Sequence, residues 1–163
     1  NISGRTFDDP AIPNYISNLL NEYHVDPKRL IIELTETAAV SDVQDAQRFI
    51  EAVHQTGCRV CLDDFGSGFS TFGYLKYLGV EVLKIDGLFI RDLPNNRDNQ
   101  IFVKAMVEVA RGLGKITVAE FVEDAATLSM VKNLGIDLAQ GYYLGRPEAN
   151  FPRDHHKKAV NYL

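Results

Sequence analysis

Carboxylates stand at the ends of four successive strand-like stretches of this sequence. Two consecutive aspartates, Asp63 and Asp64, end the apolar run in "VCLDDFGSGF" and precede a glycine-rich loop. Neighbouring carboxylates at the end of a buried strand repel each other and are costly to bury unless a positive charge binds between them. The polar residues that end the other strand-like runs are Glu33 and Glu36, Lys84 and Asp86, Glu120 and Glu123, and Gln140.

This set of residue types predicts a metal site. Converging carboxylates without an arginine cluster to neutralise them suit a hard cation, Mg²⁺ or Mn²⁺, which prefers oxygen ligands. Because consecutive strand residues project to opposite sides, we expect Asp63 and Asp64 to serve one metal each or to bridge a pair. Two such ions at about 4 Å clamp the attacking and leaving oxygens in phosphoryl transfer. Lys84 would then hold the nucleophilic water or offset phosphate charge.

A purely structural role is the simpler interpretation of several polar residues in this sequence. A single acid at a strand end is usually the N-cap of the next helix, which accounts for Glu123 or Asp124 taken alone. The pair Cys58 and Cys61 forms a C-x-x-C, but inside a strand pattern residues three apart face opposite sides. We therefore expect two separate core thiols. The four histidines lack zinc-ligand spacing.

The elements that position these residues alternate between short β-branched runs and helical stretches, as in a parallel α/β fold. In such folds the carboxyl ends of the strands form the catalytic edge. The five predicted strands are 29–36, 59–65, 80–86, 116–121 and 136–141.

Four helices are predicted around these strands. The first begins at Asp9 and Pro10, and the second begins at a capping box of Ser41 and Gln44 and ends at Gly57. The third spans 99–112, and the fourth is capped by Asp124 and ends at Gly135. The inward face of the third helix is predicted to comprise Phe102, Val103, Met106, Val107 and Ala110.

Strand–helix units of roughly 25 to 35 residues suit a (β/α)8 TIM-like barrel, whose eight units need about 250 residues. Five strands do not close such a barrel, so either the sheet is open or the N-terminal strands are missing from this chain. The abrupt start at Asn1, without a methionine, favours the second interpretation. We expect one domain over residues 1–150 and a C-terminal tail over 151–163.

Composition narrows the function classes. With 163 residues and 45% hydrophobic composition, the chain is expected to be globular. Its net charge of -5, with acids and bases interspersed, argues against a nucleic-acid polymer as partner. No apolar run approaches the roughly 18 residues of a membrane span, so we expect no membrane contact by this stretch. We predict a cytoplasmic location. This prediction also covers the case in which the chain is the cytoplasmic domain of a larger, membrane-anchored protein.

Five ordered motifs carry a family resemblance. The segments "ELTET", "DDFGSGFS", "LKID", "AEFVE" and "QGYYLGRP" resemble the bacterial EAL domain, the cyclic di-GMP phosphodiesterase, from Asn1 to about Pro147. The resemblance implies a modified TIM barrel that binds cyclic di-GMP at the C-terminal face of its strands. It also implies two Mg²⁺ or Mn²⁺ ions that activate water to open one phosphodiester, giving linear pGpG.

The resemblance assigns roles residue by residue. It implies metal ligands at Asn1, Glu33, Asp63, Asp64 and Glu120. It also implies that Lys84 positions the catalytic water, that Asp63, Asp64 and Glu120 take part in catalysis, that Glu123 and Gln140 complete the site, and that Glu36 anchors the "DFGSGFS" loop. In the family this loop couples the site to dimerisation, so a homodimer is implied, as is an upstream sensor or GGDEF domain.

Two departures from the family pattern matter. The Glu-Ala-Leu signature, whose glutamate is a metal ligand, belongs before this stretch, so we expect the stretch alone not to be competent. Phe121 stands where the family usually has glycine, and its bulk would alter loop packing or the ligand pocket. The leading hypothesis is an active phosphodiesterase. The alternatives are a catalytically inactive EAL-type receptor and, more remotely, an enolase-like barrel with Lys84 as base.

Overall fold

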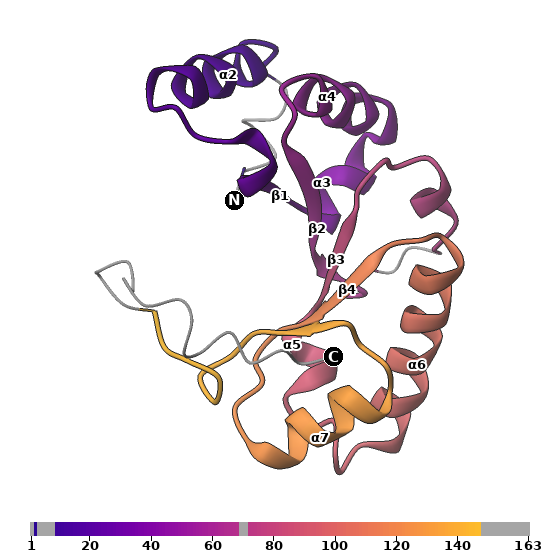
Figure 1. Ribbon diagram of the computed structural model, residues 1–163. Helices are drawn as coiled ribbons and strands as arrows, with labels where there is room; N and C mark the ends of the chain where they lie inside the picture. The colour runs from indigo at the N-terminus through magenta and orange to yellow at the C-terminus, as the bar shows by residue number, and fades with distance from the viewer. Residues whose placement is uncertain (1, 3–8, 69–71, 148–163) are drawn as a thin grey trace.

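The structure is a computed structural model that describes residues 2, 9–68 and 72–147 (Figure 1). Asn1 and the predicted tail at 151–163 lie outside these residues. Five parallel strands form one sheet in chain order, which confirms the predicted parallel α/β architecture. The strands are β1 (Ile31–Thr35), β2 (Arg59–Phe65), β3 (Val82–Ile85), β4 (Ile116–Ala119) and β5 (Leu138–Ala139).

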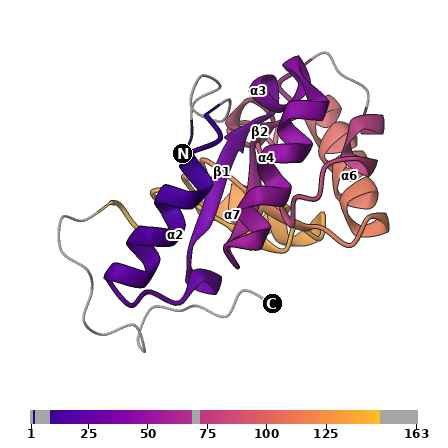
Figure 2. The same cartoon turned by 90° about the horizontal axis from the view of Figure 1, so that it is seen from above.

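Helices connect the strands and lie on one side of the sheet. In Figure 1 the sheet forms an arc with α4 and α6 on its convex side, and Figure 2 shows α2 on the β1 side of the molecule. The helical segments are α2 (Ile12–Glu22), η1 (Pro27–Arg29), α3 (Glu36–Ser41), α4 (Val43–Gln55), η2 (Phe72–Lys76), α5 (Gly87–Ile90), α6 (Arg97–Gly112) and α7 (Ala125–Asn133).

The hydrophobic core lies between the convex side of the sheet and these helices. Strand residues such as Leu34, Leu62 and Leu83 are fully buried there, together with Val53 of α4 and Val103 of α6. Removal of this apolar surface from water is the main stabilising contribution to the fold. The core therefore fixes the strands and, with them, the positions of the residues at their ends.

The opposite face of the sheet is only partly covered by the described residues. Ile31, Ile116 and Leu138 alternate with core residues along their strands and remain 37%, 38% and 48% exposed. Ile2 forms an isolated parallel bridge to Leu34 at the outer edge of β1, whereas β5 pairs only with β4 within the described part of the chain. The observed sheet is thus an open arc whose inner face carries exposed apolar residues.

Several predicted helix ends are confirmed. Asp124 caps α7, since its Oδ1 accepts a hydrogen bond from the Thr127 amide at 2.7 Å. Gly57 and Gly135 follow α4 and α7 with φ of +86° and +77°, a left-handed conformation that glycine adopts at little cost. Cys58 lies in the core and Cys61 on the opposite face, and both are buried free thiols, as predicted.

Two predicted helix starts are wrong. Ser41 is the last residue of α3, and its hydroxyl donates to the Ala38 carbonyl, while the adjacent Asp42 caps α4 by accepting from the Asp45 amide. The first helix begins at Ile12, and Asp9 instead accepts from the Ala11 amide in the preceding turn. The neighbouring Asp42 thus takes the place of Ser41 as the cap of α4, whereas α2 has Ala11 at its N-cap position and no side-chain cap.

One predicted inward residue of α6 is also wrong. Phe102 is 56% exposed, whereas Val103, Met106, Val107 and Ala110 are buried as predicted. These four residues already fill the stripe that faces the sheet, so Phe102 lies at its edge. There its ring centroid is 6.2 Å from that of Phe89.

No helix in the described part of the chain is long and apolar enough to span a membrane.

Candidate active site

Lys84 of β3 is surrounded by carboxylates from three neighbouring elements. Its Nζ lies 2.8 Å from Asp63 Oδ1, 2.8 Å from Glu120 Oε1 and 3.4 Å from Glu33 Oε1. The parallel register brings these residues to one edge of the sheet, because β1, β2, β3 and β4 all end there. Lys84, Asp63 and Glu120 are only 7%, 8% and 9% exposed. The structure thus brings four of the predicted site residues together.

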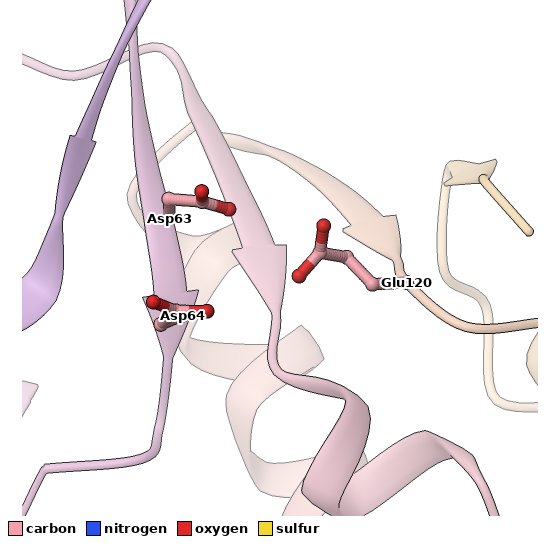
Figure 3. Close-up of side chains that lie close together, drawn as sticks. All are labelled: Asp63, Asp64 and Glu120. Atoms are coloured by element: carbon pink, nitrogen blue, oxygen red, sulfur yellow. The ribbon is translucent and has the colours of Figure 1, made fainter. Parts of the chain in front are cut away.

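Asp64 joins this group because β2 is irregular at its end. Its φ is +56°, and the pairing of β2 with β3 shifts register between Leu62 and Phe65. Asp63, Asp64 and Glu120 each offer a carboxylate oxygen within 4.8 Å of the others (Figure 3). The expectation that the two aspartates project to opposite sides is therefore wrong, since the bulge re-aims the second one.

The backbone at Asp64 is strained. A left-handed conformation costs a non-glycine residue roughly 1 to 3 kcal/mol, and such residues persist where the surrounding structure holds them. Here the strain places a second carboxylate beside Asp63, against the repulsion between like charges. A cation bound between the carboxylates would offset this repulsion.

The charge of the cluster is unbalanced, with four carboxylates, Glu33, Asp63, Asp64 and Glu120, facing one ammonium group. Burial and the charge of Asp63 raise the pKa of Asp64. Burial also raises the pKa of Glu120, while Lys84 opposes that effect. Burial alone would lower the pKa of Lys84, but hydrogen bonds to Asp63 and Glu120 outweigh it and raise the pKa. The carboxylate oxygens fit Mg²⁺ or Mn²⁺, whose charge would relieve the repulsion.

A thiol underlies the cluster. Cys61 is two residues before Asp63 on the same face of β2 and is 2% exposed. Burial, and then the charge of Glu33, raise the pKa of Cys61 to about 12. The thiol is therefore neutral at physiological pH and serves as apolar packing below the carboxylates.

A cavity of about 680 Å³ opens beside Glu120. The predicted residues Glu123 and Gln140 line this cavity and are exposed, so the structure places them next to the carboxylate cluster through Glu120. Tyr142 and Arg146 also line it, and the Arg146 guanidinium carbon lies 4.9 Å from the centre of the Tyr142 ring. Aromatic faces stack on nucleobases, and guanidinium groups bind phosphate.

Sequence reasoning did not single out Tyr142 or Arg146. Both belong to the motif "QGYYLGRP", in which only Gln140 is a predicted site residue. The signal that could have identified them is the combination of aromatic and basic residues directly after a strand that ends at the catalytic edge.

Glu36 holds the loop that follows the two aspartates. It is 1% exposed, and one oxygen accepts hydrogen bonds from the amides of Gly66 at 2.9 Å and Gly68 at 3.3 Å. Its other oxygen accepts from the hydroxyl of Tyr74 in η2, and burial and this bond raise the pKa of Tyr74. A buried carboxylate thus connects α3 to both the loop and η2. Tyr74 carries no local sequence signal, because its partner is 38 residues away.

Replacing Tyr74 with phenylalanine should lower the free energy of unfolding by about 1 to 3 kcal/mol, since a buried carboxylate oxygen would lose its donor. Urea denaturation measures the effect. The control is Tyr77→Phe, because the Tyr77 side chain is 66% exposed and its loss should change stability by less than about 0.5 kcal/mol. Equal effects of the two substitutions would contradict a stabilising role for the bond between Tyr74 and Glu36.

The fold and the site together define a parallel α/β protein with an acidic cluster and one lysine at the carboxyl ends of its strands. Residues 1–147 match the EAL domain, and the chain belongs to this family. Cyclic di-GMP phosphodiesterase PdeB from Shewanella oneidensis is 35% identical over 148 residues, covering 91% of this chain and 17% of PdeB. MucR from Pseudomonas aeruginosa, a bifunctional diguanylate cyclase and cyclic di-GMP phosphodiesterase, is 35% identical over 147 residues, covering 90% of this chain and 22% of MucR.

Solved EAL domains have the same fold as the described part of this chain. The P. aeruginosa FimX EAL domain bound to c-di-GMP superposes with a TM-score of 0.87 at 28% identity, covering 94% of this chain and 63% of the FimX chain. The MucR phosphodiesterase in complex with c-di-GMP gives a TM-score of 0.85 at 35% identity, with 90% and 60% covered. The chain therefore spans less than two thirds of the solved domains and about a fifth of the curated relatives.

Proposed function

We propose that this chain forms part of an EAL domain that hydrolyses cyclic di-GMP to linear pGpG with two Mg²⁺ or Mn²⁺ ions. The observation that carries the proposal is the convergence of Asp63, Asp64 and Glu120 within 4.8 Å at a buried lysine. The names of PdeB and MucR support this substrate. Every site residue that the described motifs should supply is present, which favours an enzyme over an inactive receptor.

The proposed roles follow from position and charge. Asp63, Asp64 and Glu120 would hold the metal ions, with Glu33 as a further carboxylate and Asn1 as a ligand on the grounds of family resemblance. Bound Mg²⁺ or Mn²⁺ lowers the pKa of a water molecule and offsets phosphate charge. Lys84, held by Asp63 and Glu120, would orient the attacking water by donating a hydrogen bond.

Substrate would extend from the cluster into the cavity beside Glu120. Tyr142 offers an aromatic face for a guanine base, and Arg146 offers a cation for a phosphate. Glu123 and Gln140 would complete this part of the site with hydrogen bonds. Glu36 would anchor the loop after Asp64 and so keep both aspartates in place.

We further propose that the arc of five strands is part of a (β/α)8 barrel. The exposed Ile31, Ile116 and Leu138 on the inner face support this, because further strands would cover them. A cytoplasmic homodimer with an upstream sensor or GGDEF domain is proposed on family grounds, and the bifunctional name of MucR supports the GGDEF domain.

The test is formation of pGpG from cyclic di-GMP by the full-length protein. Chromatography separates the product from the substrate and measures it. We expect product with Mg²⁺ or Mn²⁺, background levels after EDTA treatment, and recovery when the metal is restored. Product formation that persists in EDTA would contradict the metal mechanism. Tight binding of cyclic di-GMP without product in any metal would identify a receptor instead and overturn the proposal.

A further inference from the structure

Phe121 follows Glu120 directly and has an unusual conformation. Its φ is +53°, in the left-handed region that disfavours residues with a side chain. It is one of three described non-glycine residues with positive φ, together with His24 and Asp64. Two of the three therefore lie at the carboxylate cluster, where strain in the backbone often has a function.

The left-handed turn changes which side chains face the site. In a regular strand Glu120 and Val122 would point to the same side. Here the carboxylate of Glu120 contacts Lys84, whereas Val122 is fully buried in the hydrophobic core. The Glu120 amide donates to the Ile85 carbonyl at 3.4 Å, and the Val122 amide donates to the Gln140 carbonyl at 3.0 Å. The turn at Phe121 thus lets Glu120 face the site and Val122 face the core while both backbone amides keep a hydrogen bond.

The ring of Phe121 packs on the start of α5. Gly87, the first residue of α5, has no room for a Cβ, which would lie 2.9 Å from Phe121 Cε2 and closer still to Cδ2. The Arg91 guanidinium carbon lies over the same ring, 4.1 Å from its centre. Gly87 is only three residues after Lys84. The ring therefore connects the residue after Glu120 to the segment that follows Lys84.

We propose that Phe121 is a positioning residue for Glu120. Its ring, seated on Gly87 and Arg91, holds the strained turn that keeps the Glu120 carboxylate beside Lys84 and the two aspartates. A glycine at this position would adopt the same φ without strain, but it would lack the contact with α5 and would leave the turn free to take other conformations. The inference rests on the proposed metal-binding function of the cluster.

The experiment measures Mn²⁺ affinity and thermal unfolding of the full-length protein. The Mn²⁺ binding that is lost in the Asp63→Ala variant defines binding at the carboxylate cluster. Electron paramagnetic resonance of free Mn²⁺ gives the affinity. We expect Phe121→Gly to weaken this binding by about tenfold, the lower end of the effect found when groups that orient metal ligands are removed. Phe121→Tyr keeps the ring and should bind Mn²⁺ like the unmodified protein.

Gly87 supplies a matched test of the contact. Gly87→Ala should weaken Mn²⁺ binding, because the added methyl group displaces the ring. In a Phe121→Ala background the same substitution should have no further effect, because the ring is absent. Additive effects of the two substitutions would overturn the proposal.

Two further results would overturn it. Phe121→Gly with unchanged Mn²⁺ affinity, whether or not the melting temperature falls, would mean that the ring contributes to stability alone. Absence of Asp63-dependent Mn²⁺ binding in the unmodified protein would refute the proposed metal site itself, and with it the role of Phe121. This outcome is distinguishable from the first because it is seen without any substitution at Phe121 or Gly87.

Discussion

Replacing Asp63 with asparagine should reduce the turnover of cyclic di-GMP by about a thousandfold, the upper end of what the loss of one preorganised charge-stabilising group costs. The amide keeps the size of the side chain but removes the charge that attracts a cation. Asp63 Oδ1 also contacts Lys84 Nζ at 2.8 Å, so the substitution weakens the hold on the lysine as well. Mn²⁺ affinity should fall together with turnover.

The fold should tolerate this change. The cluster contains four carboxylates and one ammonium group, so removal of one negative charge reduces repulsion in the absence of metal. Asp42→Asn is the matched control, because Asp42 is an exposed N-cap of α4 and asparagine caps helices equally well. Its turnover should equal that of the unmodified protein. Near-normal hydrolysis by Asp63→Asn would show that the two-metal mechanism is wrong.

The sequence predicted the architecture of the site because that architecture depends on patterns that repeat. Alternating β-branched and helical runs imply parallel strands, and parallel strands place their carboxyl ends at one edge. The meeting of Asp63, Lys84 and Glu120 follows from this arrangement alone. The strand predicted at 59–65 matches β2 fully, while the other strands are shorter. Their polar ends leave the sheet, as Asp86 does to cap α5.

The details that sequence could not predict depend on single backbone angles and distant contacts. The hydrophobic pattern of β2 contains no sign that Asp64 is left-handed, so the sequence predicts both aspartates at the site but not the backbone turn that brings them together. Ser41 and Asp42 are both good capping residues, and only the final backbone selects Asp42. Tyr74 meets Glu36 through tertiary packing, which no local propensity records.

Replacing Lys84 with methionine should lower turnover by about a hundredfold, because a preorganised cation near the attacking water would be lost. Methionine has similar length and fills the same space. Unlike Asp63→Asn, this substitution should not weaken Mn²⁺ binding. Lys84 Nζ lies 2.8 Å from both Asp63 and Glu120, so the ammonium group competes with a metal for the same oxygens. Its removal should leave Mn²⁺ binding unchanged or tighter.

Stability should separate the two roles of Lys84. Without metal, Lys84→Met leaves buried carboxylates with no counter-charge, and breaking a buried ion pair in this way costs about 3 to 5 kcal/mol. Mn²⁺ should restore much of this stability, because it binds the folded state and replaces the missing charge. Urea denaturation with and without Mn²⁺ measures the difference. A variant that is stabilised by Mn²⁺ yet turns over slowly shows that Lys84 acts on the reaction, whereas normal turnover would reduce Lys84 to a counter-ion of the metal-free site.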